Sequence, residues 1–288
     1  MAYGAKNPVA GLGLCVSILI AALILTPSTA AGQSVGSPKT VPTPLAPMPA
    51  DANPGFEVAT IKPSDTSAPH GTSIHHNGRQ IIAYNMSVRQ LITYAYSLHA
   101  KQITGGPASL LATHFDIDGV PDIDGHANIQ QTRSMFQKLL VSRFRLAFHY
   151  ESRELPVFAI QVGKGGPHLS PTASKPGDST EFTYTCQAVL TVRNYSVADV
   201  AKGMQDVFLD KPVVDQTGLR DRYDFDLKWT PDDSQTYCPS NAARSRDNPN
   251  APPGLYTAIQ EQLGLKIVPT RAPVQVMVID HVEKPSEN

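Results

Sequence analysis

The 288-residue chain lacks the signatures of several large functional classes. It contains no Ser-x-x-Lys segment, and its Gly-x-Ser-x-Gly match at Gly32–Gly36 falls in a proline-rich stretch that lacks the strand and helix patterns such a nucleophile motif joins. Its 24 Lys and Arg residues nearly balance 25 Asp and Glu residues, and no basic run occurs, which is atypical of a nucleic-acid-binding protein. Catalytic residues can converge from distant segments, so these absences lower the odds of an enzyme without excluding one.

Cysteine is also scarce, with three residues in the chain. Cys15 lies in the N-terminal apolar segment, which leaves Cys186 and Cys238 for the remainder. Two thiols are too few for a metal site built from cysteine alone. In an oxidising compartment the pair indicates one disulfide, and two free thiols are the alternative.

The N-terminus has the pattern of an export signal, which we assign to residues 1–31. Lys6 supplies positive charge, residues 12–25 form an apolar run, and small residues follow at 27–31. The run is shorter than the roughly 20 residues that span a bilayer. We therefore expect an exported protein, periplasmic or secreted, that meets a membrane only if the signal stays uncleaved as an anchor.

Residues 32–55 form a proline-rich segment, with prolines at 38, 42, 44, 47, 49 and 54. Such a composition favours extended conformations and indicates a linker. Residues 56–288 are then numerous enough to bury a sizeable core without disulfides.

An internal repeat is the strongest positive signal in the sequence. Three segments of the first half recur in the second half, where similar residues follow in the same order. The pairs are Asn85–Leu91 with Asn194–Val200, Phe115–Asp118 with Tyr223–Leu227, and Leu155–Ile160 with Ala272–Met277. The pattern predicts two like units, 56–168 and 169–288, the second with a mobile insert at 231–253 that is rich in Pro, Asn and Ser.

Each unit is predicted to contain two helices among several strands. Ser87 begins a helix with Gln90 three residues later, a capping box, and Ser196 begins its counterpart. Asn77-Gly78 predicts a type I′ hairpin turn. The order favours an α+β fold of two tandem repeat units, with mixed or antiparallel sheets each covered by helices.

The later elements are predicted from shorter patterns. A helix is expected at 129–144 and another at 255–263, where Gly264 provides a left-handed cap. Strands are expected at 182–193 and at four shorter segments, with a hairpin end near Arg153-Glu154. The four segments are 146–151, 155–162, 265–268 and 274–282.

Candidate metal ligands are explained more simply by local structure. His75 and His76 are adjacent on a strand and point to opposite faces, and His70 and His99 add no ligand spacing. The acidic series Asp116, Asp118, Asp122 and Asp124 lacks the closing Glu of an EF-hand, and its first two members are the polar face of a strand. We predict no catalytic, cofactor-binding or metal residues and no cofactor.

Five ordered motifs resemble a known family of soil-associated exported proteins of unknown function, which occur as many paralogues in some soil bacteria. The motifs are Phe56–Ser64, Arg153–Val157, Lys164–Pro167, Lys211–Leu219 and Val278–Asn288. The resemblance implies export and a shared fold. It implies no catalytic residues, and some relatives are fused to membrane sensor proteins.

Together these features favour a non-catalytic binding or interaction module for an unidentified small-molecule, peptide or protein ligand. We expect its site in the concave seam between the halves. Two alternatives stay open. A hydrolase of envelope or extracellular polymers would bring polar groups such as His75, His149 and Asp215 into one pocket. An extracytoplasmic sensing domain would act on a membrane partner.

Overall fold

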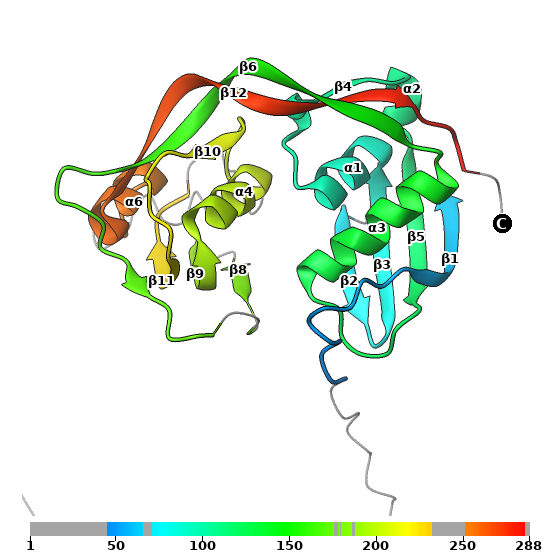
Figure 1. Ribbon diagram of the computed structural model, residues 1–288, viewed down its shortest axis with the longest axis horizontal. Coiled ribbons are helices and arrows are strands. Elements are labelled where there is room, and N and C mark those ends of the chain that lie inside the picture. Colours follow the sequence, from blue (N-terminus) through cyan, green and yellow to red (C-terminus); the bar gives the residue numbers. More distant parts are fainter. Residues whose placement is uncertain are drawn as a thin grey trace, which may run out of the picture. The chain divides into compact units, whose positions relative to one another are not determined.

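Three four-stranded sheets and the helices packed against them form the part of the chain that the computed structural model describes (Figure 1). The described residues are 45–65, 71–175, 178, 180–185, 188–231 and 251–285. The fold is α+β, as the sequence predicts.

The first sheet is antiparallel and has the order β1-β5-β3-β2. Helices α1 and α3 lie against it, and their apolar stripes share one core with the inner residues of β3 and β5 (Figure 1). The elements are β1 (Phe56–Pro63), β2 (Ser73–Asn77), β3 (Gln80–Ser87), α1 (Val88–Tyr96), α2 (Ala108–Leu111), β5 (His114–Pro121) and α3 (Ile129–Arg143).

The second sheet has the corresponding order β7-β11-β9-β8 and is antiparallel as well. Helices α4 and α6 contribute their apolar residues to a second core with β9 and β11. The elements are β7 (Ser170–Pro171), β8 (Glu181–Thr185), β9 (Val189–Ser196), α4 (Val197–Val207), β11 (Arg222–Lys228) and α6 (Leu255–Leu263).

The third sheet is built on two long antiparallel strands, β6 (Ala147–Val162) and β12 (Leu265–His281). Two short strands flank them in parallel orientation, β10 (Val213–Asp215) beside β6 and β4 (Ile103–Gly105) beside β12. A short 3-10 helix, η1 (Ala100–Gln102), precedes β4. In Figure 1 the β6–β12 pair runs from α6 to α2.

The prediction that each long strand is interrupted, with a hairpin end near Arg153-Glu154, is wrong. Charged residues and prolines in the middle of both strands indicate a break in the sequence pattern. The pairing of β6 with β12 nevertheless continues through these residues, with Pro156 opposite Arg271. The flanking strands pair only with residues 158–160 of β6 and 277–279 of β12. The middle of each long strand is therefore paired on one side only. A proline whose nitrogen faces the unpaired side removes no hydrogen bond between the strands.

Each core takes side chains from the long strand that begins in the other core. Met277 and Ile279 of β12 lie in the first core, whereas Phe158 and Ile160 of β6 lie in the second. The segments that recur in the sequence meet here, because Leu155 is paired directly with Ala272. The two cores are thus tied together by exchanged strands.

Local turns confirm most of the capping predictions. Ser87 and Gln90 form the capping box of α1, Ser196 caps α4, and Gly264 ends α6 at φ 65°. The β2–β3 hairpin is present, but its two turn residues are Gly78 and Arg79, of which only Gly78 has a positive φ. That pattern fits a type II′ turn, one residue later than expected.

The single strand expected at 182–193 is instead the β8–β9 hairpin. Alternation of apolar and polar residues continues across the turn, so the sequence period does not reveal it. Ala188 at φ 55° reverses the chain just before β9.

Several predictions fall on residues outside the described ranges. They include the signal at 1–31, His70, Cys186, Cys238 and residues 232–250 of the expected insert. The end of the proline-rich segment is described, and it is packed: Met48 is 5% exposed and its amide bonds to His126 O at 3.0 Å. Within the described residues, no helix is both long and apolar enough to cross a bilayer.

Candidate functional site

A cavity of about 550 Å³ lies between α1 and the C-terminal end of α4. We call it the seam pocket, because one wall comes from residues 86–100 and the other from residues 205–210. Apolar side chains, among them Met86, Leu98 and Phe208, line it together with polar ones. The polar residues are Gln90, Thr93, Tyr94, His99, Gln205 and Asp210.

Polar contacts join the two walls. The Lys101 ammonium donates to the backbone oxygen of Asp210 at 2.6 Å and lies 3.6 Å from its carboxylate. Gln205, which is 5% exposed, donates from Nε2 to Ser97 O at 3.3 Å and accepts from the Val213 amide at 3.1 Å. Ser97 ends α1 at φ 53° and so turns the chain towards His99.

His99 is held by a cap of its own. Its Nδ1 accepts from the Lys101 amide at 3.1 Å, while Gln102 Oε1 accepts from the His99 amide at 3.0 Å. Burial lowers the pKa of His99, and the Lys101 charge lowers it further against an opposing effect of Asp210. A neutral imidazole that accepts at Nδ1 carries its proton on Nε2.

The polar groups that α1 contributes to the seam pocket are also uncharged. Gln90 Oε1 accepts from the Ser87 amide at 2.8 Å in the capping box, which leaves its Nε2 amide as a donor. Burial raises the pKa of Tyr94 to about 12 although the Arg133 guanidinium opposes this, so its hydroxyl is protonated at neutral pH.

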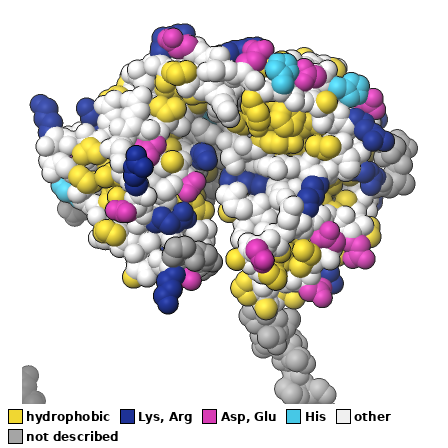
Figure 2. Space-filling model, viewed as in Figure 1, with side chains coloured by type: hydrophobic (Ala, Val, Ile, Leu, Met, Phe, Trp, Pro, Cys, Tyr) yellow, Lys and Arg dark blue, Asp and Glu magenta, His cyan; other side chains and the backbone are white. Residues whose placement is uncertain are grey.

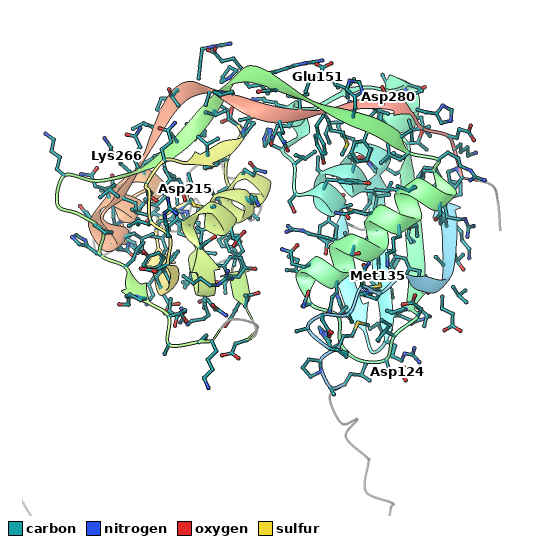
Figure 3. The ribbon with its side chains drawn as sticks, in the orientation of Figure 1. Asp124, Met135, Glu151, Asp215, Lys266 and Asp280 are labelled. Carbon is teal, nitrogen blue, oxygen red and sulfur yellow. The ribbon has the colours of Figure 1, made fainter. Side chains whose placement is uncertain are left out.

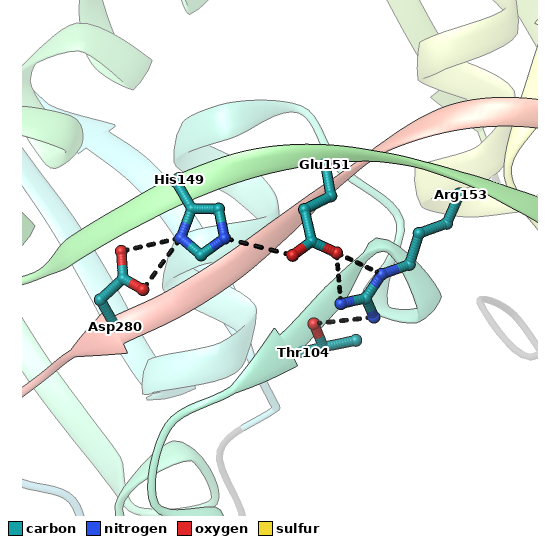
Figure 4. Close-up of polar contacts among 5 residues, drawn as sticks. All are labelled: Thr104, His149, Glu151, Arg153 and Asp280. Atoms are coloured by element: carbon teal, nitrogen blue, oxygen red, sulfur yellow. Dashed lines mark hydrogen bonds and ion pairs between the residues drawn. The ribbon is translucent and has the colours of Figure 1, made fainter.

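A second polar cluster follows one face of the β6–β12 pair (Figure 4). His149 Nδ1 lies 2.9 Å from Asp280 Oδ1, and its Nε2 lies 3.3 Å from Glu151 Oε1. Arg153 Nε donates to Glu151 Oε2 at 2.8 Å, and Arg153 also reaches Thr104 Oγ1 at 3.4 Å. Odd-numbered residues of a strand share one face, which is why three β6 side chains line up.

Opposite charges set the protonation of this cluster. Hydrogen bonds to Asp280 and then Glu151 raise the pKa of His149. Hydrogen bonds from Arg153 and then His149 lower the pKa of Glu151. All these side chains are about half exposed, so the cluster is a surface clamp between β6 and β12.

Aromatic side chains lie on the opposite face of β6. Phe148 packs edge-on against Tyr96 of α1 at 5.0 Å and against Tyr150 at 5.4 Å between ring centroids. Figure 2 shows apolar side chains gathered on this part of the surface. Tyr150 is 43% exposed, and burial raises the pKa of Tyr96 to about 12.

The residues named for a hydrolase do not meet in one pocket. His75 is exposed on β2 and packs against Tyr84, with ring centroids 5.4 Å apart. His149 belongs to the clamp on β6. Asp215, at the end of β10, accepts from the amide and the hydroxyl of Thr217 at 2.8 and 2.7 Å and so closes a turn (Figure 3).

The histidines of the first sheet have structural surroundings. His76 stacks on His126 at 4.6 Å and lies 3.4 Å from Thr132 Oγ1. Burial lowers the pKa of His76, and the charges of His126 and His75 add to that effect. Within the described ranges, no group of three His, Cys, Asp or Glu side chains is arranged to hold a metal ion.

The acidic series is likewise divided among separate tasks. Asp116 accepts from the Asn85 amide at 2.8 Å and from Ser64 Oγ at 2.6 Å. Asp122 accepts from the Gly55 amide at 2.8 Å, whereas Asp124 pairs with Arg79 at 2.9 Å (Figure 3).

From the sequence, two residues of the seam pocket stand out: His99, as an unconvincing metal ligand, and Gln90, as the capping-box partner of Ser87. The other wall was assigned to the helix begun by Ser196 and its end. Its approach to α1 brings together positions more than 100 apart in the chain, such as Ser97 and Gln205. The internal repeat is the sequence signal that points to the pocket, because two packed units predict a seam between them.

These features of the described residues define an α+β protein with two sheet-based cores, a pair of exchanged strands and a seam pocket. The chain belongs to the family described as protein of unknown function DUF3738, whose model matches residues 89–282. No curated protein matches the chain. No solved structure matches it either.

Proposed function

We propose that the protein is a non-catalytic ligand-binding module that acts outside the cytoplasm. The seam pocket carries the proposal. Its volume of about 550 Å³ is in the range of small-molecule sites, and it combines apolar walls with a few polar groups. Export rests on the signal-like residues 1–31.

The proposal includes an origin in two repeated units. Supporting it, the first two sheets share one strand order, and in each a serine-capped helix follows the strand that bears a positive-φ asparagine, Asn85 or Asn194. The backbone amide of Asn85 donates to the Asp116 carboxylate at 2.8 Å, and that of Asn194 donates to the Asp224 carboxylate at the same distance. In this account the seam pocket arises where equivalent helices, α1 and α4, approach each other.

Binding is favoured over turnover because two polar side chains of the pocket, Gln205 and His99, already have structural roles. Gln205 joins the walls and His99 caps η1. In the described part of the pocket wall, no serine or cysteine lies beside a base that would activate it.

A thermal-shift screen of the mature protein tests the proposal, because a ligand of the native state raises its apparent stability. Ala100 is exposed and lines the pocket, so Ala100→Phe should fill it and abolish the shift. Ala112→Phe, an exposed alanine at the end of α2 and outside the pocket wall, is the matched control. Hits that Ala100→Phe leaves unchanged would contradict the proposal.

A further inference from the structure

The described lining of the seam pocket offers no free charge to a ligand. Asp210 is the one carboxylate among these lining residues and already lies 3.6 Å from both the Lys101 and the Lys211 ammonium groups, while no Lys or Arg is among them. His99 is held neutral by burial and by its cap. An ionic ligand would leave its hydration shell without meeting an opposite charge, and that loss is costly.

The uncharged polar groups are varied and alternate with apolar surface. Gln90 offers an amide N–H, His99 offers Nε2–H, and Tyr94 offers a hydroxyl. Met86, Leu98 and Phe208 provide apolar contacts beside them. The complementary ligand is neutral, has several hydroxyl or carbonyl groups, and presents at least one apolar face.

An extended peptide fits this wall poorly. Peptides commonly bind by adding a strand to an open sheet edge, where backbone groups are unpaired. The seam pocket is walled chiefly by α1, α4 and the turns after them, and helical backbone groups are bonded within the helix. The pocket therefore offers side chains, and no strand edge, to a ligand.

We propose that the seam pocket binds a neutral sugar unit of an oligosaccharide, an inference that rests on the proposed function. The ring hydroxyls would meet the Gln90 amide, the His99 imidazole and the Tyr94 hydroxyl. The C–H face of the sugar would lie on Met86, Leu98 or Phe208. Charged sugars are disfavoured because the described lining residues include no free charge of either sign, and peptides because these residues present no open strand edge.

The protein carries its own reporter for this test. Its single tryptophan, Trp229, is 2% exposed and packs edge-on against Phe208 at 5.1 Å. Phe208 lines the pocket, so a ligand there should change the emission of Trp229. The titration uses neutral gluco-, xylo-, manno-, galacto- and N-acetylglucosamine trisaccharides, with trigalacturonate and an end-blocked tripeptide as contrasts.

We expect saturable emission changes with at least one neutral trisaccharide and none with the acidic sugar or the peptide. Ala100→Phe should abolish the change, and Ala112→Phe should retain it. Two further variants preserve the caps while altering the pocket. Gln90→Glu keeps a capping-box acceptor, and His99→Asn keeps a good N-cap acceptor. Each should weaken sugar binding about tenfold, the effect of one lost hydrogen bond.

The outcomes separate the two proposals. No response to any neutral trisaccharide overturns the sugar assignment. Binding of the tripeptide or trigalacturonate that Ala100→Phe abolishes also overturns it, yet leaves the proposed binding function intact. Sugar binding that is insensitive to Ala100→Phe overturns the site itself. Unchanged affinity in both Gln90→Glu and His99→Asn removes the contacts on which the assignment depends.

Discussion

The backbone amide of Asn85 donates a 2.8 Å hydrogen bond to the carboxylate of Asp116. Asn85 has φ 50°, a left-handed conformation that asparagine tolerates better than most residues. The bond lies where the register of β3 and β5 shifts, between Ala83 and Met86. Asp116 therefore stabilises an irregularity just before α1, the helix that forms one wall of the seam pocket.

Removal of that acceptor should destabilise the fold. We expect Asp116→Ala to lower the free energy of unfolding by about 1–3 kcal/mol, because a backbone amide loses its partner. Asp116→Asn should cost less, since it keeps an Oδ1 acceptor. Asp118→Ala is the control, because Asp118 is exposed and its carboxylate accepts a long hydrogen bond of 3.5 Å from Gln80 Nε2. Urea unfolding measures all three, and equal losses at positions 116 and 118 would refute the role.

Gly264 should be far less replaceable than Gly78, although both have φ near 60° (65° and 60°). A Cβ on Gly264 would collide with the backbone oxygen of Gly166, whereas one on Gly78 would meet open space. Gly78→Ala should cost about 1 kcal/mol for its backbone conformation. Gly264→Ala should cost about 1–3 kcal/mol more through the collision. Thermal unfolding of the two variants provides the comparison, and similar losses would argue against the close approach.

These glycines and caps show what a sequence can predict. Ser87, Gln90 and Gly264 act through neighbours three or four residues away, so local pattern is sufficient. The continuity of β6 depends instead on β12, more than 100 residues later, and the charged and proline residues along it resemble a turn. The seam pocket is harder still to predict from the sequence, because it depends on the exchange of strands that brings α1 near α4.

The exchanged strands predict an effect of Met277 on the first core alone. Met277 is fully buried there, so Met277→Ala should cost about 2–5 kcal/mol. Hydrogen exchange should accelerate in α1 and α3 while α4 and α6 stay protected. Val278→Ala, on the other face of β12 and partly exposed, should cost much less. Faster exchange confined to α4 and α6 would contradict the assignment of β12 to the first core.

The His149 clamp predicts a pH dependence. Its pKa should exceed the ordinary 6.5, and Asp280→Asn should lower it more than Glu151→Gln does. A raised pKa in the folded state contributes stability below about pH 6.5 that is lost as pH rises through the folded value. Asp280→Asn should therefore destabilise the protein more at pH 6 than at pH 9. Imidazole NMR titrations and unfolding at both pH values test this, and a His149 pKa at or below 6.5 would oppose it.

The most direct test of the central claim is methionine-methyl NMR on the full mature protein. Met86 lines the seam pocket, whereas Met135 is fully buried in the first core and absent from the pocket wall. Titration with the neutral trisaccharides and a general fragment library should shift the Met86 methyl signal in proportion to occupancy and leave Met135 in place. Ligands that bind while the Met86 signal stays unmoved would place the binding site elsewhere and contradict the account.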